Sequence, residues 1–195
     1  MSDSQTHWDA RWRDKRTQQG IVQADPWLID IYPRLDQGQA LDVACGNGSN
    51  AVFLASHGFE VTAIDVSREA LKQLKRESAL RNLNIKAFQI DLEDDPVLPE
   101  GPFNLILDFF YLYRPLFPKL KKLLLPGGLM AIRTFSRAGD FPEIALNPAF
   151  VLEPGELKDI FCGWDVLVYE EGKQPSPKGG SLAGILTRKP LDPSG

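Results

Sequence analysis

The stretch LDVACGNGSN, residues 41–50, decides the fold of this chain. An apolar segment runs into a glycine-rich turn, and a second apolar segment with helical spacing follows directly. A strand, a tight glycine turn and a helix in this order are typical of the start of a nucleotide-binding α/β unit. The stretch therefore predicts an α/β protein with a nucleotide-like ligand at the turn.

Strands and helices alternate along most of the chain. Apolar, β-branched segments predict seven strands, at residues 40–45, 60–65, 85–90, 103–109, 129–135, 164–170 and 181–188. Helical spacing and capping residues predict helices at residues 50–57, after Ser67, from Pro115 to Pro126-Gly127-Gly128, and near Pro154. The loop between the last two strands is too short for a helical crossover, so these strands should pair antiparallel. We expect a doubly wound, mostly parallel seven-stranded sheet with a C-terminal antiparallel hairpin and helices on both faces.

The composition is ordinary for a globular protein, with 43% hydrophobic and 25% charged residues. A net charge of −4 weighs against a nucleic-acid partner, which usually meets a basic surface. The N-terminal sequence is too polar for a signal peptide, and no apolar run could cross a bilayer. We therefore expect a cytoplasmic protein without membrane contact. Cys45 and Cys162 should be reduced thiols, and no Cys/His cluster has the spacing of metal ligands.

Two ligands could occupy the glycine turn. A dinucleotide is supported by Gly46–Ala51, which fits the G-x-G-x-x-G/A pattern, and by Asp65, which ends the next strand about 20 residues on. In that site the acid would bind the ribose. The alternative is S-adenosylmethionine, which carries no phosphate.

Three features favour S-adenosylmethionine. Asp42 is a charge within the first strand, unwelcome near a pyrophosphate but suited to the ammonium of a methionine moiety. Asp91 ends the third strand and can accept from an adenine amino group, while the N–H of Leu92 donates to the ring. The chain is also short for a dehydrogenase, which normally needs a further substrate domain.

The chain resembles the Rossmann-like (class I) S-adenosylmethionine-dependent methyltransferases. The matching segments are LDVACGNG, EVTAID, QIDLED, FNLILDFF, LLLPGGLMAIRTF and the closing hairpin, within residues 40–188. Within this superfamily it is most similar to the small tellurite-resistance-type methyltransferases, through HWDARW, DFFYLYRPLF and NPAFVLEPGELKDIF. Ala44 stands where the first motif of the superfamily often has a glycine. Alanine is small enough to let the backbone approach a ligand.

The resemblance implies one domain over residues 1–190. An N-terminal lid or helical segment would span residues 1–36, and the Rossmann-like core residues 37–188. Residues 191–195 are expected to be a disordered tail.

The expected cofactor site uses the ends of the first three strands. The methionine end would lie on the turn, at Asp42, Ala44, Cys45, Gly46 and Gly48. Asp65 would accept from both ribose hydroxyls, Val66 would pack on the adenine, and Asp91 and Leu92 would bind its edge. Arg11 could bind the cofactor carboxylate in a two-pronged fashion, with Trp12 as a cover. The alternatives are a surface helix for Arg11 and Trp12, a helix cap for Asp65 and a solvated loop for Asp91.

The expected acceptor side follows the fourth strand. The resemblance implies that Asp108, Phe109, Phe110 and Tyr111 face the transferable methyl, although one of the two phenylalanines should belong to the core. Arg114 and Arg133 could bind an anionic acceptor, or each could pair with a nearby acid.

We therefore expect an enzyme that uses S-adenosyl-L-methionine to methylate a small molecule by in-line displacement, leaving S-adenosyl-L-homocysteine. The acceptor could be soft or anionic, such as a thiol or a chalcogen oxyanion. Tyr111, Arg114 and Arg133 are the candidate catalytic residues. Two alternatives remain open: an NAD(P)-dependent oxidoreductase and a non-catalytic S-adenosylmethionine-binding module.

Overall fold

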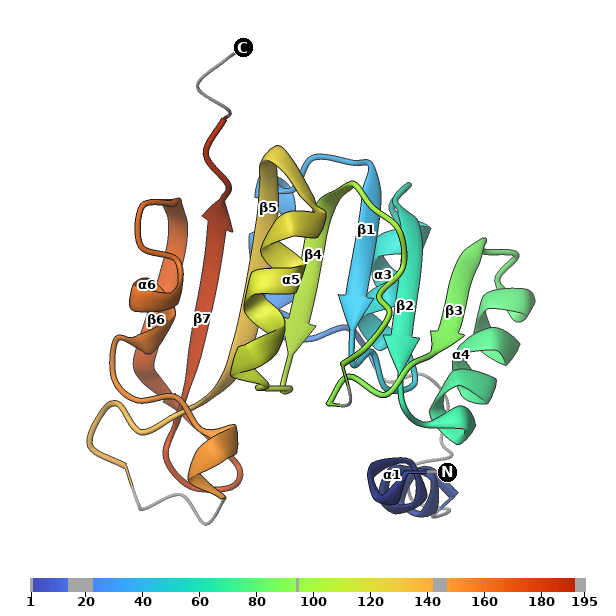
Figure 1. Ribbon diagram of the computed structural model, residues 1–195, viewed down its shortest axis with the longest axis horizontal. Helices are drawn as coiled ribbons and strands as arrows, with labels where there is room; N and C mark the ends of the chain where they lie inside the picture. Colours follow the sequence, from blue (N-terminus) through green and yellow to red (C-terminus); the bar gives the residue numbers. More distant parts are fainter. Residues whose placement is uncertain (1, 14–22, 94, 142–146, 192–195) are drawn as a thin grey trace. The chain divides into compact units, whose positions relative to one another are not determined.

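The computed structural model describes residues 2–13, 23–93, 95–141 and 147–191. Seven strands form a sheet with the order β3-β2-β1-β4-β5-β7-β6, which confirms the expected fold class (Figure 1). The chain divides into two compact units, Met1–Phe103 and Asn104–Gly195. The single domain over residues 1–190 stays a prediction. Of the expected disordered tail, residues 192–195 lie outside the described residues, as do residues 14–22 of the expected lid.

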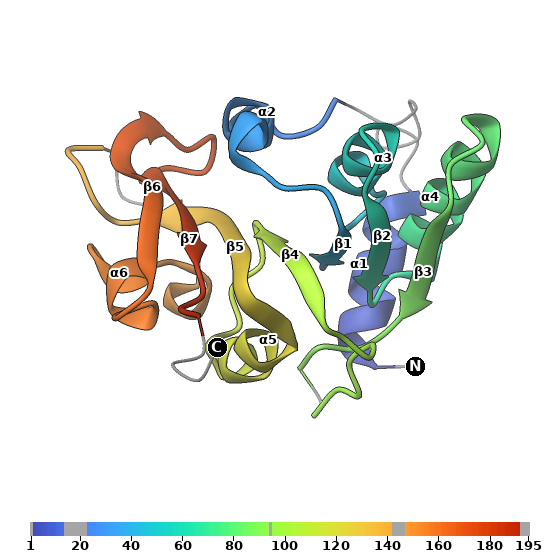
Figure 2. The ribbon, with the colours of Figure 1, turned by 90° about the horizontal axis from the view of Figure 1, so that it is seen from above.

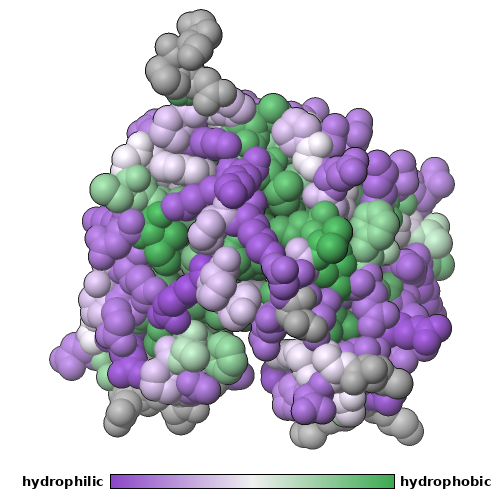
Figure 3. Space-filling view, in the orientation of Figure 1, coloured by the Kyte–Doolittle hydropathy of each residue, from purple (hydrophilic) through white to green (hydrophobic). Residues whose placement is uncertain are grey.

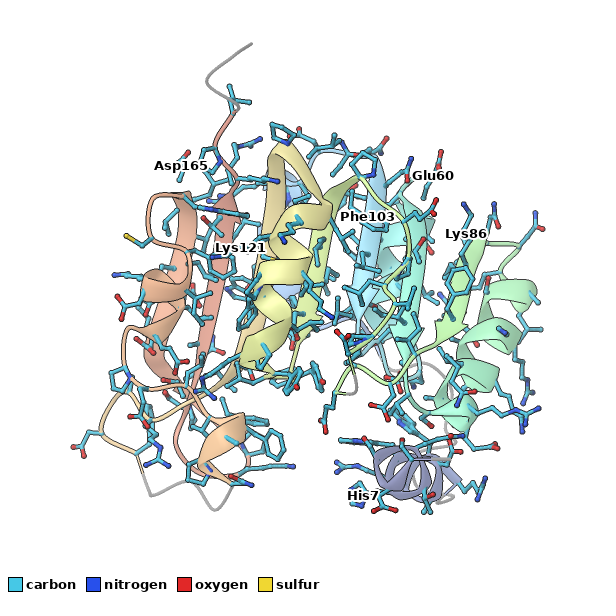
Figure 4. The ribbon with its side chains drawn as sticks, viewed as in Figure 1. His7, Glu60, Lys86, Phe103, Lys121 and Asp165 are labelled. Atoms are coloured by element: carbon cyan, nitrogen blue, oxygen red, sulfur yellow. The ribbon has the colours of Figure 1, made fainter. Side chains whose placement is uncertain are left out.

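The first unit contains three parallel strands, β1 (Gln39–Val43), β2 (Glu60–Asp65) and β3 (Ile85–Gln89). Because they are parallel, their carboxyl ends share one edge, and helix α1 (Asp3–Arg13) lies beyond that edge in Figure 1. Glu60 and Lys86 lie toward the opposite edge, as Figure 4 shows. In open parallel sheets, ligands bind beyond the carboxyl ends of the strands.

Helices α3 (Ser49–Ser56) and α4 (Arg68–Leu80) connect these strands. Strands β1 and β2 are buried except at their first residue, as expected for strands covered on both faces. Ser67 caps α4 as predicted, because its Oγ accepts a hydrogen bond from the Ala70 amide at 3.2 Å. A short helix, α2 (Pro26–Ile31), and a 3₁₀ turn, η2 (Tyr32–Arg34), precede β1.

The second unit carries the remaining strands. They are β4 (Phe103–Phe109), β5 (Leu124–Ser136), β6 (Asp165–Pro175) and β7 (Ser181–Arg188). Strand β7 pairs antiparallel with both β5 and β6, which confirms the expected C-terminal hairpin. Its short helices are η3 (Arg114–Leu116), α5 (Phe117–Leu123), η4 (Pro148–Phe150) and α6 (Glu156–Ile160).

The start of β5 differs from the prediction. The Pro126-Gly127-Gly128 sequence was expected to stop a helix, but α5 ends at Leu123 and β5 already begins at Leu124. The backbone supplies the reason: the Gly127 amide donates to the Lys189 carbonyl, and the Lys189 amide donates to the Gly128 carbonyl. These bonds draw the segment into the pairing with the chain after β7.

None of the helices within the described residues is both long and apolar enough to span a lipid bilayer.

Candidate functional site

The glycine turn follows β1 and leads into α3. Ala44, Gly46 and Gly48 all have positive φ values, of 49°, 56° and 80°. A Cβ added at Gly46 would lie 3.0 Å from Cζ2 of Trp12, and one added at Gly48 would collide with the side chain of Leu74. The turn therefore requires glycine at both positions, for backbone conformation and for close packing. At Gly48 the crowding comes from Leu74 of helix α4, and the contact of Gly48 with a cofactor stays a prediction.

Asp65 supports this turn from the end of β2. Its Oδ2 accepts from the Gly46 amide at 2.7 Å, and its Oδ1 accepts from the Ser67 amide at 2.7 Å. Burial raises the pKa of Asp65, and these two hydrogen bonds, with a further one from the Val66 amide, oppose the shift. Each carboxylate oxygen can accept a second hydrogen bond, so the side chain retains capacity for ribose hydroxyls.

Asp42 is the second buried acid at the turn, with 2% of its surface exposed. The Ala51 amide, in the first turn of α3, donates to it, yet within the described residues Oδ2 has no hydrogen-bond partner. Burial and the neighbouring charge of Asp65 raise the pKa of Asp42 to about 7. A buried carboxylate oxygen without a donor is unfavourable, and a cationic ligand such as an ammonium would relieve that cost. This oxygen fits the methionine end of S-adenosylmethionine.

The thiol of Cys45 is half-buried and close enough to Asp42 and Asp65 for both charges to affect its pKa. Its pKa is raised well above the usual value, first by burial and then by the charges of Asp42 and Asp65. A thiol held in its protonated form is a weak nucleophile. Its role as part of the cofactor turn stays a prediction.

Trp12 lies against the glycine turn, whereas Arg11 is exposed on the surface of α1. Trp12 is half-buried, and its ring lies against Gly46; its role as a cover over the cofactor stays a prediction. Arg11 is exposed, and its guanidinium carbon lies 5.2 Å from the centre of the Trp8 ring. The binding of a cofactor carboxylate by Arg11 stays a prediction.

The expected adenine side lies after β2 and β3. Val66 is half-buried, and its carbonyl accepts from Nε2 of Gln89 at 3.2 Å. Oδ1 of Asp91 accepts from the Glu93 amide at 3.2 Å, so this acid also organises its own loop. Leu92 is buried. The contacts of Val66, Asp91 and Leu92 with adenine stay predictions.

In the second unit, the two phenylalanines at the end of β4 differ in their exposure to solvent. Phe109 is buried in the core, whereas Phe110 is 44% exposed, with a φ of 60°. The Phe110 amide donates to the Arg133 carbonyl at 2.7 Å, and the Phe110 ring lies 5.6 Å from that of Phe135. A positive φ on a bulky residue is strained and is held by its surroundings. Phe110 is therefore the ring of this pair that is available to a ligand.

The other residues expected on the acceptor side are more enclosed. Asp108 and Arg133 are buried, and Tyr111 is half-buried. Nη2 of Arg133 donates to Oε1 of Gln174 at 2.7 Å.

Arg114 pairs with a nearby acid, which was the alternative to binding an anionic acceptor. Its Nε and Nη2 donate to the carboxylate of Glu156 at 2.5 and 2.8 Å. The remaining contacts go to the Ala149 and Val151 carbonyls. The charge of Arg114 lowers the pKa of Glu156, and the carboxylate in turn raises the pKa of Arg114. The guanidinium thus ties three loop segments of the second unit together, as in the alternative in which it pairs with an acid, and its role toward an acceptor stays a prediction.

One buried acid was missed by the sequence analysis. Asp9, in α1, is 3% exposed and accepts from Oγ of Ser67 and from the Glu69 amide. The available signal was the i, i+4 spacing of Gln5, Asp9 and Arg13, which gives α1 one polar face.

Comparison with known proteins identifies the family of this chain. The family model "Tellurite resistance protein TehB" matches residues 20–175. The probable S-adenosyl-L-methionine-dependent methyltransferase TehB of Haemophilus influenzae (strain 10810) is 26% identical over 149 residues, covering 74% of this chain and 52% of that protein. Thiopurine S-methyltransferase of Pseudomonas putida (strain GB-1) is 28% identical over 196 residues, covering 88% and 89%.

The crystal structure of TehB from Haemophilus influenzae has a similar fold, with a TM-score of 0.73 at 20% identity. The match covers 89% of this chain and 65% of that one. This chain spans about half the length of the TehB relative that it matches in sequence.

The fold is that of the Rossmann-like methyltransferases, as expected, and the sequence relatives named above are a probable S-adenosyl-L-methionine-dependent methyltransferase and a thiopurine S-methyltransferase. Within this class, the chain belongs to the TehB family of tellurite resistance proteins.

Proposed function

We propose that this protein transfers the methyl group of S-adenosylmethionine to a small-molecule acceptor with a soft nucleophilic atom. The observation that carries the proposal is the pair of buried acids at the glycine turn. Asp42 has an oxygen without a donor among the described residues, and Asp65 keeps acceptor capacity beyond its hydrogen bonds from the Gly46, Ser67 and Val66 amides. Two carboxylates suit a ligand with an ammonium group and ribose hydroxyls, and they would repel a pyrophosphate.

The residues of the first unit would hold the cofactor by its two ends. Asp42 and the turn around Gly46 bind the methionine end, Asp65 accepts from the ribose, and Val66 packs on the adenine. Asp91 and the Leu92 amide bind the adenine edge. When bound, S-adenosylmethionine supplies an electrophilic methyl group on a sulfonium and a neutral thioether as leaving group.

The protein then has to align the acceptor and keep water away. As the acceptor lone pair forms its bond to the methyl carbon, the bond between that carbon and sulfur breaks and its electrons stay on sulfur. A deprotonated thiol or a chalcogen oxyanion attacks without a general base. Oxygen and nitrogen acceptors more often need proton removal, and Tyr111 or Asp108 would be the candidates for it.

The soft acceptor is supported by the names of the relatives and by one residue of the second unit. The matched family is named for tellurite resistance, and the Pseudomonas putida relative is a thiopurine S-methyltransferase. Phe110, exposed and held in a strained conformation after β4, offers a ring face to an acceptor. Arg133 is the remaining arginine candidate for an anionic acceptor.

Calorimetry with S-adenosylhomocysteine tests the cofactor assignment. We expect binding by the parent protein, a rise in its melting temperature, and no binding of NADH. Asp42→Asn should weaken binding, whereas Asp30→Asn, the same change on the exposed face of α2, should not. Binding of NADH without binding of S-adenosylhomocysteine would overturn the proposal in favour of an oxidoreductase.

A methyl-transfer screen tests the acceptor. Aromatic and aliphatic thiols, tellurite and selenite would be offered beside amines and phenols of similar size. Turnover restricted to the sulfur, selenium and tellurium compounds is the expected result. Cofactor binding without turnover of any acceptor would favour the non-catalytic binding module.

A further inference from the structure

We propose that Asp9 is a positioning residue that latches helix α1 to α4 and thereby holds Trp12 over the cofactor turn. The inference rests on the proposed function, because it concerns the same site. The observation behind it does not depend on a ligand: Asp9 is a buried carboxylate in α1, a helix with no other buried residue.

The latch is one carboxylate with four polar contacts, two of them to the start of α4 and two within α1. Oδ1 of Asp9 accepts from Oγ of Ser67 at 2.7 Å and from the Glu69 amide at 3.1 Å. Oδ2 accepts from Nε2 of Gln5 at 3.4 Å, and a guanidinium nitrogen of Arg13 lies 3.9 Å away. Burial raises the pKa of Asp9, but these hydrogen bonds and the charge of Arg13 outweigh it, so the pKa is lowered overall. The carboxylate is therefore charged at neutral pH and satisfied by its partners.

Helix α1 has little apolar surface to hold it in place. Asp9 is its single buried residue, and Trp8 is 37% exposed. Figure 3 shows hydrophilic to intermediate colours over this helix, and His7 points away from the strands in Figure 4. An isolated helix of 11 residues is marginal in water, so its docking depends on the polar contacts. Figure 2 shows α1 lying alongside α4, the helix that receives the latch.

The latch and the cofactor turn are joined through Ser67. Its Oγ donates to Asp9, while its amide donates to Asp65 at 2.7 Å, and Asp65 in turn accepts from the Gly46 amide. On the other side of the turn, the Trp12 ring covers Gly46, and the Trp12 carbonyl accepts from Nε2 of Gln73 at 3.2 Å. Release of Asp9 would therefore loosen both the cover and the support of the turn.

For the reaction, the consequence is a closed cofactor site. A Trp12 ring held over the turn excludes water from the methionine end and slows cofactor release. Residues of α1 never touch the acceptor in this scheme. Loss of the latch should raise the KM for S-adenosylmethionine and leave the KM for the acceptor near the parental value.

The experiment compares Asp9→Ala with two control variants. Asp9→Asn keeps an oxygen that can accept from Ser67 and Glu69 and should rescue most of the loss. Ser78→Ala removes a hydroxyl that donates to the Leu83 carbonyl at the other end of α4, so it destabilises the same helix without touching α1. Hydrogen exchange of the α1 amides is measured without ligand, and the affinity for S-adenosylhomocysteine by calorimetry.

We expect the α1 amides of Asp9→Ala to exchange at the rate of an undocked helix, and the dissociation constant to rise about tenfold, as for the loss of a charge-assisted hydrogen bond. Ser78→Ala should change neither quantity. Unchanged α1 exchange in Asp9→Ala would overturn the latch, whatever the affinity. Faster exchange with parental affinity would overturn the positioning role. A parent protein that does not bind S-adenosylhomocysteine would refute the proposed function and the positioning role with it, while the exchange result would still decide the latch.

Discussion

The glycine turn of the first unit and the contacts of Arg114 in the second unit differ in how far the fold satisfies a charged side chain. Asp42 keeps an oxygen without a donor among the described residues, and its pKa is raised to about 7. Arg114 instead makes four hydrogen bonds, to Glu156 and two carbonyls. A charge that the fold leaves under-satisfied is prepared for a ligand, whereas a charge saturated by its own chain serves stability.

The largest effect should come from Asp65→Ala. This variant loses the acceptor for Gly46 and Ser67 together with the proposed ribose contact. Charge-assisted hydrogen bonds contribute roughly 1.5–3 kcal/mol each, so the affinity for S-adenosylhomocysteine should fall by about a hundredfold or more. Calorimetry measures the affinity, with circular dichroism to verify the fold. Parental affinity in this variant would show that the ribose assignment is wrong.

A second comparison sets Gly48→Ala against Gly155→Ala. Both glycines have φ values near 80°, but a Cβ at Gly48 meets Leu74, whereas one at Gly155 has no described atom within 4 Å. Both variants carry a strain cost of about 1 kcal/mol, and Gly48→Ala should lose about 1–2 kcal/mol more. Urea unfolding measures the difference. Equal losses would mean that Leu74 moves aside without cost.

The third prediction concerns the pH dependence of stability. Burial raises the pKa of Asp42 from 3.8 to about 7, so the folded protein holds this proton more tightly than the unfolded chain. Between these values, stability from this group falls as the pH rises, by up to about 1.4 kcal/mol per pH unit. Asp42→Asn removes the dependence, so the variant should gain stability relative to the parent between pH 5 and pH 7. A constant difference in urea unfolding over this range would contradict the raised pKa.

The pH dependence of cofactor affinity should have the opposite sign to that of stability. The charged form of Asp42 attracts the ammonium of the ligand, so affinity for S-adenosylhomocysteine in the parent should rise as the pH passes through about 7. In Asp42→Asn the affinity should be lower and flatter over the same range.

The smallest effect should come from Arg114→Met. The Arg114 side chain is 38% exposed, so solvent weakens its ion pair, and we expect a loss of about 1 kcal/mol and a melting temperature lower by roughly 2–4 °C. Affinity for S-adenosylhomocysteine and the KM for an acceptor should stay parental. A higher KM for an anionic acceptor at unchanged melting temperature would restore the anion-site hypothesis.

Much of the fold and of the candidate site followed from local sequence signals. The pattern of apolar residues predicted the strands, and Ser67 predicted the N-terminal cap of α4. The spacing of Gly46, Gly48 and Asp65 indicated a nucleotide-like site. These features depend on neighbours within a few residues, or on a strand–turn–helix unit that is itself continuous in the chain. The start of β5 was missed because a distant backbone segment around Lys189 pairs with Gly127 and Gly128.

The sequence by itself determined the α/β class, the family and the turn that holds the proposed cofactor. The tertiary structure alone decided which charges are satisfied. Arg114 meets Glu156 across 42 positions, and Asp9 meets Ser67 across 58. The physical reason is that the pKa of a group and its capacity to bind a ligand depend on burial and on partners brought together by folding, and sequence spacing does not encode either.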